Sequence, residues 1–372
     1  MRIAVVILNW NTKDYLRKFL PALLLSIEEF NGEGGDDFAE AVVADSASTD
    51  GSMEMMEEEF PSVRRIPLDK NYGFTGGYNR ALEELIRRPD SDSSPNAETG
   101  QTAPFDIFIL LNSDIEVTHD WLRPLSDWMK IHPECGACGP KLHSWYERDK
   151  FEYAGAAGGY VDRFGYPFCR GRVLGKVETD RGQYDTPADV LWVTGACLTV
   201  RAELWKSLGG LDSRFFAHME EIDLCWRMQL EGHKVTVVPQ SLVYHLGGGT
   251  LPQNSPQKLY LNYRNNLLLL DNNLALTIGC RKATVRIFFR KILDGCSAAV
   301  YLLSFRPEYF KAVWRAHRDA AKLIGEKRTA ATDDVHDAPE NTAPDACTRG
   351  KVQGLYGGCM IPRALLGLKI KV

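Results

Sequence analysis

Three acidic residues stand close together in an otherwise aromatic and apolar stretch of the chain. Glu220, Glu221 and Asp223 follow shortly after Phe215 and Phe216. On a helix, Glu220 and Asp223 would share one face, and Glu221 would point about 100° away from them. Apolar surroundings raise the pKa of a carboxyl group toward the range in which it works as a general base. Acidic residues also favour helix N-termini, which explains one or two of the three more easily than all of them.

A further acidic residue is a candidate ligand for a metal ion. Asp114 follows the apolar run 107–111 directly, after Asn112 and Ser113. A carboxylate after a buried strand can hold Mg²⁺ or Mn²⁺ against a diphosphate, because these cations often take only one or two ligands from the protein. The alternative is an ordinary turn or helix cap. His245 precedes a Gly-rich stretch, but a lone histidine is more often structural than a metal ligand.

The elements that must position these residues alternate between strand and helix. Apolar runs of strand length cover 3–8, 39–44, 64–68 and 107–111, and helical spacing covers 13–30, 50–60 and 75–88. This order favours an α/β fold with a parallel sheet covered on both faces, in which ligands bind at the carboxyl ends of the strands. Each polar turn that follows a strand is ordinary alone. Four of them at one edge favour a ligand site, where Asp45 is placed to accept a hydrogen bond from a base.

The overall composition is that of a folded globular protein. The chain has 372 residues, of which 44% are hydrophobic and 25% charged, with a net charge of −5. These values exclude a wholly disordered chain, a collagen-like repeat and a coiled coil, and they give no reason to expect a nucleic-acid partner. Residues 281–328 differ, because they hold 12 Lys and Arg against 4 Asp and Glu. This basic stretch also carries aromatic residues, so a membrane interface and a solvated helical face are equal alternatives.

The N-terminus and the cysteines indicate a reducing compartment. The apolar stretch after Met1 is too short for a signal peptide, and the nine cysteines are an odd number, so we expect a cytoplasmic protein. Cys135 and Cys138 form a single CxxC, which is weak evidence for zinc. The longest apolar candidate, 287–305, is interrupted by charges, so we expect no membrane-spanning helix.

Taken in order, several motifs resemble glycosyltransferase family 2 over about residues 1–270. The matching segments are VVILNWN, VVADSASTDGS, NYGFTGGYNRAL, LLNSDIEV, TGACLTVRAELWKSLGGLDSRFF, EEIDLCWR and VYHLGGGT. The resemblance implies the GT-A nucleotide-diphospho-sugar transferase fold, a mostly parallel sheet flanked by helices. Bacterial rhamnosyltransferase-like members look most similar. Two positions depart from the family pattern, because Glu221 stands where Asp is usual and Asn112 replaces the more usual first Asp.

The resemblance also implies a role for each candidate residue. Glu221 would be the catalytic base, with Glu220 and Asp223 as alternatives. Asp114 and His245 would hold Mn²⁺ or Mg²⁺. A UDP- or dTDP-sugar would be the donor, and Asn9, Asp45 and Asn79 would contact its nucleoside. The full nucleotide-sugar site would comprise Leu8, Asn9, Asn11, Asp45, Ser48, Gly76, Asn79, Asn112, Ser113 and Asp114. The acceptor and donor sugars would meet Trp192, Thr194, Gly195 and Ala196.

The sequence therefore predicts an inverting, divalent-metal-dependent glycosyltransferase of cell-surface glycan synthesis. Its acceptor would be a glycan or a lipid-linked molecule, and the protein would be cytoplasmic, with the inner face of the cell membrane as a site of peripheral contact. The alternative function is a catalytically inactive nucleotide-sugar-binding subunit. A nucleotidyltransferase and a dinucleotide dehydrogenase rank lower, because no Gly-rich loop follows the first strand. We expect a GT-A domain at 1–270, a basic helical region at 271–328, a disordered linker at 329–350 and a tail at 351–372.

Overall fold

A mixed sheet forms the centre of the molecule. The computed structural model describes residues 1–87, 104–153, 155–173, 175–247, 255–335 and 351–361. The strand order is β11-β13-β6-β12-β4-β1-β2-β3, with β5 beside β13. Neighbours from β4 to β3 are parallel, as are β6 and β13, while β12 runs antiparallel between β4 and β6. The expected mostly parallel α/β sheet is confirmed. The strands are β1 (Arg2–Asn9), β2 (Phe38–Asp45), β3 (Arg64–Pro67), β4 (Ile107–Asn112), β5 (Ile115–Val117), β6 (Cys135–Ser144), β11 (Ala188–Asp189), β12 (Cys197–Arg201) and β13 (Lys234–His245).

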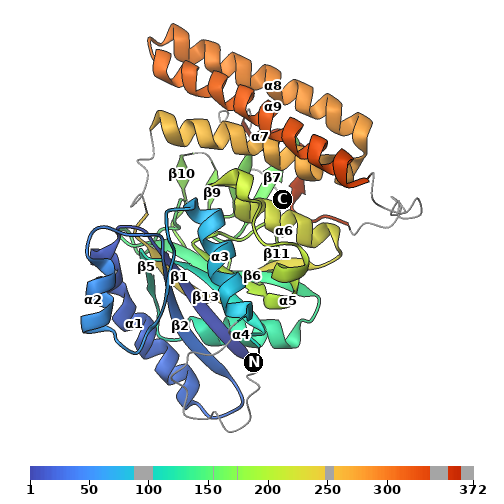
Figure 1. The fold of residues 1–372 in the computed structure, drawn as a ribbon. Helices are drawn as coiled ribbons and strands as arrows, with labels where there is room; N and C mark the ends of the chain where they lie inside the picture. Colours follow the sequence, from blue (N-terminus) through green and yellow to red (C-terminus); the bar gives the residue numbers. More distant parts are fainter. Residues whose placement is uncertain (88–103, 154, 174, 248–254, 336–350, 362–372) are drawn as a thin grey trace.

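Helices cover both faces of this sheet (Figure 1). Side chains of β1 alternate between the two resulting cores: Ile3 and Val5 pack with α1, while Ala4 and Val6 pack with Tyr78 of α3. Such a strand is apolar throughout because both of its faces are buried. One face carries α1 (Lys13–Gly32), α2 (Ser52–Glu59) and α4 (Leu122–Ile131), and the other carries α3 (Gly73–Arg87), α5 (Ala202–Ser207) and α6 (Glu220–Leu230).

A smaller sheet is completed by a strand from the C-terminal tail. Its order is β10-β9-β8-β7-β14, and β14 pairs in parallel with β7. The tail is also tied to the domain by two hydrogen bonds, from Gln353 N to Gln229 Oε1 (2.6 Å) and from Met360 N to Asp162 Oδ2 (2.9 Å). The sequence did not predict this return. The strands are β7 (Gly159–Asp162), β8 (Pro167–Cys169), β9 (Arg172–Val173), β10 (Lys176–Val177) and β14 (Leu355–Tyr356).

Three long helices form a layer over one end of the molecule (Figure 1): α7 (Pro256–Ile278), α8 (Cys280–Leu303) and α9 (Pro307–Val335). The expected domain boundary at residue 270 falls inside α7, which runs unbroken because its inner face packs against α6. The helix α9 also continues beyond residue 328 into the expected linker. Residues 336–350 lie outside the described residues, as does all but the last residue of the stretch 89–104, whose polar composition predicts an exposed loop. Among the described helices, none is long and apolar enough to cross a membrane.

The position of Gly354 gives a test of the tail. Gly354 has a positive φ of 76°, and a Cβ there would overlap the backbone of Leu191. We therefore expect Gly354→Ala to lower the free energy of unfolding by about 2 kcal/mol and to speed tryptic cleavage at Lys351. Gly357→Ala is the matched control, since no described atom lies within 4 Å of its Cβ position. Equal melting temperatures and cleavage rates for both variants would show that the tail is not held as described.

Candidate active site

A polar network joins the carboxyl ends of β1, β2 and β4. Asn9 Nδ2 donates to Asp45 Oδ1 (2.6 Å) and to Ser48 Oγ (3.1 Å). Thr12 Oγ1 donates to Asn9 Oδ1 (2.5 Å) and lies 2.9 Å from Ser113 Oγ. The structure thus brings together four residues that the sequence placed at a nucleotide-sugar site, and Thr12 links them.

The rest of the predicted nucleotide site adjoins this network. Asn11 has a positive φ of 55°, and its N–H donates to Ser48 Oγ (2.9 Å). The first turn of α3 approaches β1 closely, because a Cβ on Gly77 would lie 2.7 Å from the Leu8 side chain. Gly76 is equally confined, since its Cβ would lie 2.8 Å from another side-chain carbon. The small residues therefore let the start of α3 lie directly against the end of β1.

Two of the predicted site residues make structural contacts instead of facing an open site. Asn79 Nδ2 donates to Leu211 O (2.7 Å), and Asn79 Oδ1 accepts from Leu211 N (2.9 Å). Trp192 Nε1 donates to Tyr160 O (3.2 Å), and its ring fills the space where Gly159 has no side chain. Both residues fix the loops around the site. Their contacts with a nucleoside or a sugar stay predictions.

A buried chain of three ionisable groups lies where the strands β4 and β13 end. His245 Nε2 lies 3.2 Å from Asp114 Oδ1, and its Nδ1 lies 3.5 Å from Glu152 Oε1. Burial by itself lowers the pKa of His245, but the hydrogen bonds and charges of Asp114 and Glu152 outweigh it and raise the pKa to about 10. The two carboxylates therefore hold the imidazole in a fixed orientation.

Asp114 and His245 fit a metal site with two protein ligands. An oxygen and a nitrogen converge there, and a metal ion would have to displace the proton that His245 shares with Asp114. Mg²⁺ or Mn²⁺ commonly completes its shell with phosphate oxygens and water. Within the described part of the chain, no group of three or more His, Cys, Asp or Glu could hold a metal ion. The donor set is therefore suited to an ion that arrives with a diphosphate rather than to a closed structural site.

The acids that begin α6 have two different environments. Glu220 is buried and Glu221 half-buried, and neither Oε2 atom has a hydrogen-bond partner among the described residues. Burial raises the pKa of Glu221 to about 7 and, together with the charge of Glu221, raises the pKa of Glu220 well above its usual range. A carboxyl group with a pKa near neutrality can accept a proton at physiological pH.

Asp223, in contrast, is fully paired. It is 0% exposed, Oδ2 lies 2.7 Å from Arg227 Nε, and Oδ1 accepts from the side-chain amides of Asn272 and Asn273 at 2.8 Å each. This residue fastens α6 to α7. Of the three acids that the sequence left open as the base, Glu221 has a half-exposed side chain and an Oε2 atom without a hydrogen-bond partner among the described residues.

The turn before β12 links Glu221 to the sheet edge. A Cβ on Gly195 would lie 3.5 Å from Glu221 Cβ. Ala196 O accepts from Asn112 N (2.9 Å), and Thr194 Oγ1 accepts from Ala196 N (3.2 Å). The predicted sugar segment therefore lies between the base candidate and the end of β4.

One important contact was missed at the sequence level. Asn265 of α7 donates its side-chain amide to three backbone carbonyls of segment 215–219, over 2.7–3.0 Å. In that segment Phe216, His218 and Met219 have positive φ angles of 65°, 72° and 71°, a strained backbone that persists only when its surroundings fix it. Asparagine is unfavourable in the middle of a helix. The several asparagines in the middle of α7 were therefore the available signal that their side chains make specific contacts.

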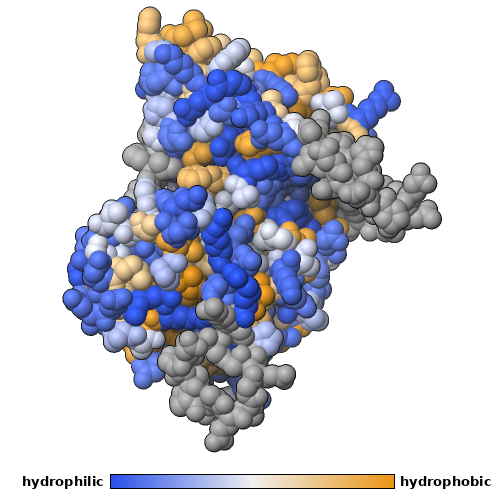
Figure 2. All heavy atoms as spheres, in the orientation of Figure 1, coloured by the Kyte–Doolittle hydropathy of each residue, from blue (hydrophilic) through white to orange (hydrophobic). Residues whose placement is uncertain are grey.

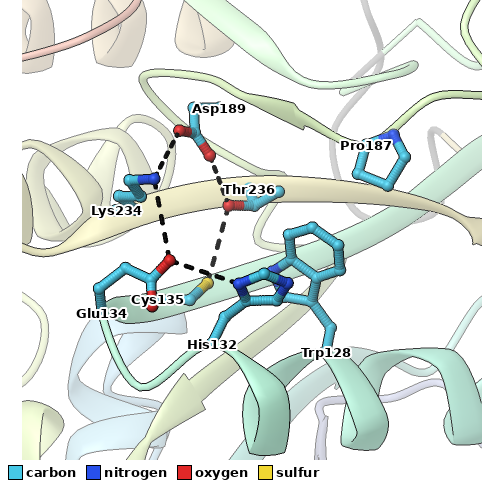
Figure 3. A pocket seen from close by; sticks show the side chains of 8 residues that line it. All are labelled: Trp128, His132, Glu134, Cys135, Pro187, Asp189, Lys234 and Thr236. Carbon is cyan, nitrogen blue, oxygen red and sulfur yellow. Dashed lines mark hydrogen bonds and ion pairs between the residues drawn. The ribbon is translucent and has the colours of Figure 1, made fainter.

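A separate pocket lies at the opposite edge of the sheet (Figure 3). It opens at the first residues of β6 and β13, whereas His245 is the last residue of β13. Its polar groups already pair with one another: Lys234 Nζ lies 3.5 Å from Asp189 and 3.8 Å from Glu134, and Thr236 Oγ1 donates to Asp189. The pocket is therefore distinct from the candidate active site.

Comparison with known proteins identifies the class of this chain as a glycosyltransferase. The family model described as "Glycosyltransferase like family 2" matches residues 1–265, and the chain belongs to this family. The chain is 24% identical over 272 residues, 72% of its length and 83% of the relative, to the N-acetylglucosaminyl-diphospho-decaprenol L-rhamnosyltransferase of Mycobacterium tuberculosis. It is 31% identical over 151 residues, 40% of its length and 12% of the relative, to the O-antigen biosynthesis protein RfbC of Myxococcus xanthus.

Solved structures confirm the fold. The structure of S. aureus TarS 1–349 in complex with UDP-GlcNAc matches with a TM-score of 0.52 at 14% identity, over 87% of this chain and 83% of the TarS chain. The GT-A fold and the glycosyltransferase class expected from the sequence are both confirmed.

Glu220 gives a test of the electrostatics at α6. The folded state keeps a proton on Glu220 that the unfolded chain releases above its pKa of about 4.3, so the wild type loses stability as pH rises. Gln has no proton to lose. The free energy of unfolding of Glu220→Gln should therefore gain on that of the wild type as pH rises above about 5, by up to about 1.4 kcal/mol per pH unit, as thermal or denaturant unfolding measures.

The matched control is Glu203→Gln, at an exposed position on α5, for which the difference from the wild type should not change with pH. A constant difference for Glu220→Gln would mean that Glu220 is ionised in the folded protein.

Proposed function

We propose that this protein transfers a sugar from a nucleoside diphosphate donor to a hydroxyl group of an acceptor, with inversion at the anomeric carbon. The observation that carries the proposal is Glu221, a half-buried residue whose Oε2 atom has no hydrogen-bond partner among the described residues and whose pKa burial raises to about 7. It lies against the Gly195 turn that joins the end of β4.

The reaction is a single displacement. Glu221 takes the proton of the acceptor hydroxyl, and the oxygen attacks the anomeric carbon. The bond from that carbon to the diphosphate oxygen breaks at the same time, and the nucleoside diphosphate leaves with the electron pair. Attack opposite to the leaving group inverts the configuration. A Mn²⁺ or Mg²⁺ ion held by Asp114 and His245 would offset charge on the diphosphate.

The donor would be a UDP- or dTDP-sugar bound at the edge formed by β1, β2 and β4. Asp45 keeps lone pairs beyond its hydrogen bonds to Asn9 and Ser48, so it can accept an N–H from uracil or thymine. A nucleoside at this place would have its diphosphate directed toward Asp114.

The acceptor would be a glycan or a lipid-linked molecule of cell-surface polysaccharide synthesis. The mycobacterial relative is named for a diphospho-decaprenol acceptor, and the Myxococcus relative for O-antigen biosynthesis. We place the reaction at the cytoplasmic face of the cell membrane, with the protein bound peripherally. A catalytically inactive nucleotide-sugar-binding subunit is the alternative, and it requires binding without turnover.

The base assignment predicts a mutational and a pH effect. Glu221→Gln should lower kcat/KM by about 10²–10⁴-fold, while nucleotide binding, followed by thermal shift, is unchanged. For the wild type, kcat/KM should fall as pH drops below about 7, because the base must be unprotonated. Glu221→Asp, which keeps the carboxyl group, should retain part of the activity. NMR of the product anomer tests inversion.

Two results would overturn these assignments. If Glu221→Gln transfers at the wild-type rate while Asp223→Asn, folded by circular dichroism, does not transfer, then Asp223 is the base. If UDP- and dTDP-sugars neither bind nor react, the proposed function is wrong.

The metal assignment has a test that does not require turnover. Titration calorimetry should show UDP or dTDP binding that strengthens when Mn²⁺ is added, and Asp114→Ala should remove that gain. Asp120→Ala, at an exposed aspartate just before α4, should keep the gain in binding that Mn²⁺ gives. An equal Mn²⁺ effect in Asp114→Ala would exclude Asp114 as a ligand.

A further inference from the structure

The helix α8 buries charged side chains and exposes large apolar ones, which is the reverse of a usual surface helix. Its buried side carries Arg290 and Asp294, between Ala283 and Ala298. Its exposed side carries large apolar residues, and Phe288, for example, is 60% exposed. Helices on the surface of a soluble domain normally turn their apolar side chains toward the core. The exposed apolar residues Val285, Phe288, Phe289, Ile292, Val300 and Leu303 recur at helical spacing and share one face, which we call the α8 outer face.

A buried ion pair fixes this orientation. Arg290 Nε lies 2.8 Å from Asp294 Oδ1, and Arg290 also donates to Phe164 O (2.9 Å) in the turn between β7 and β8. His317 of α9 lies 3.1 Å from Asp294 Oδ2. Rotating α8 to bury its outer face would carry Arg290 and Asp294 along together, but it would break their contacts with Phe164 and His317. The outer face is therefore held toward the outside by contacts with two neighbouring elements.

Further exposed apolar residues lie at the end of α8 and after it. Leu303 is 79% exposed, Phe305 in the following turn is 93% exposed, and Trp314 of α9 is 70% exposed. Figure 2 shows hydrophobic atoms gathered at the end of the molecule formed by these helices. Scattered single hydrophobic side chains are normal on a protein surface, but a contiguous patch of this kind marks an interaction site.

The exposed charges on α8 itself are all positive, while the exposed Glu308 lies at the start of α9. Arg281, Lys282 and Lys291 of α8 are exposed and Arg286 is half-buried. The only acidic residue of α8 is Asp294, which is buried and paired with Arg290. An aromatic and aliphatic face bordered by Lys and Arg, with no acid on the same helix to oppose them, complements an anionic lipid surface.

We propose that the α8 outer face docks the protein onto an anionic membrane surface. The helix would lie in the interface plane over its length of about 36 Å, with Phe288, Phe289 and Leu303 inserted among the lipid chains. The basic residues would meet the lipid phosphates. The other candidate occupant is a second copy of this chain, but that copy would present the same positive border and no acid on its own α8.

The position of α8 suits a lipid-linked acceptor. The helical layer lies over the end of the molecule at which β13 ends in His245 and the chain re-enters as α7 (Figure 1). Asn265 of α7 contacts the segment that precedes Glu221. In this respect the inference deepens the proposed function, but membrane binding itself does not depend on sugar transfer.

Vesicle flotation without sugar nucleotide tests the proposal. The full chain should float with vesicles of phosphatidylcholine and phosphatidylglycerol at low salt, and less with phosphatidylcholine alone or at high salt. The double variant Phe288→Ser/Phe289→Ser should lower the partition coefficient by about tenfold or more. The double variant Arg281→Glu/Lys282→Glu should remove the preference for phosphatidylglycerol. Glutamates at a helix N-terminus favour the helix, so this variant should stay folded.

Ile131→Ser is the matched control, because Ile131 is 72% exposed but lies on α4. It should float as the wild type does, and all variants should keep the wild-type melting temperature within about 2 °C. The proposal is overturned if the wild type does not bind phosphatidylglycerol vesicles at low salt or if Phe288→Ser/Phe289→Ser binds equally well. It is also overturned if light scattering shows a wild-type dimer that this variant converts to a monomer without any vesicle binding. Failure of flotation would leave the transfer assay, and thus the proposed sugar transfer, unaffected, and would remove only the peripheral placement at the membrane.

Discussion

The pairing of Asp223 with Arg227 and two asparagines of α7 holds the first turn of α6 in place. Two further carboxyl groups, Glu220 and Glu221, are packed into the same turn without side-chain partners among the described residues. Burying such groups is unfavourable, and the raised pKa values express that cost. Both carboxylate oxygens of Asp223 have hydrogen-bond partners, so this residue stabilises the turn. Its neighbours Glu220 and Glu221 stay available for proton transfer. The same three-acid cluster thus contains one structural member and one member suited to chemistry.

The helix α7 connects the two functional ends of the molecule. Toward the sheet, Asn265 fixes the strained segment before α6. Away from the sheet, Asn266 contacts Arg290 of α8, which in turn fixes the orientation of the α8 outer face. Polar contacts within a helical layer are directional, so they set rotation as well as distance. One helix therefore positions both the proposed base and the proposed membrane surface.

The sequence predicted the half of the fold that is encoded locally. Apolar runs such as 3–8 and the polar turns after them identified the parallel strands and the edge where Asn9, Asp45 and Ser113 meet. It left the base open among three acids, although the Asp223–Arg227 spacing of four residues already indicated a helical ion pair. Contacts between distant segments were not predictable, because Asn265 and the two-residue strand β14 carry no periodic signal. Their partners are defined only once the chain has folded.

The return of β14 to β7 has a consequence for biosynthesis. Nearly two hundred residues separate the paired positions Val161 and Leu355, and a ribosome makes about 5–20 residues per second. The small sheet next to α6 therefore keeps an open edge for roughly ten seconds or more, during which another nascent chain could pair with it. A chaperone that shields this edge until residue 355 emerges would act on a defined, short-lived target.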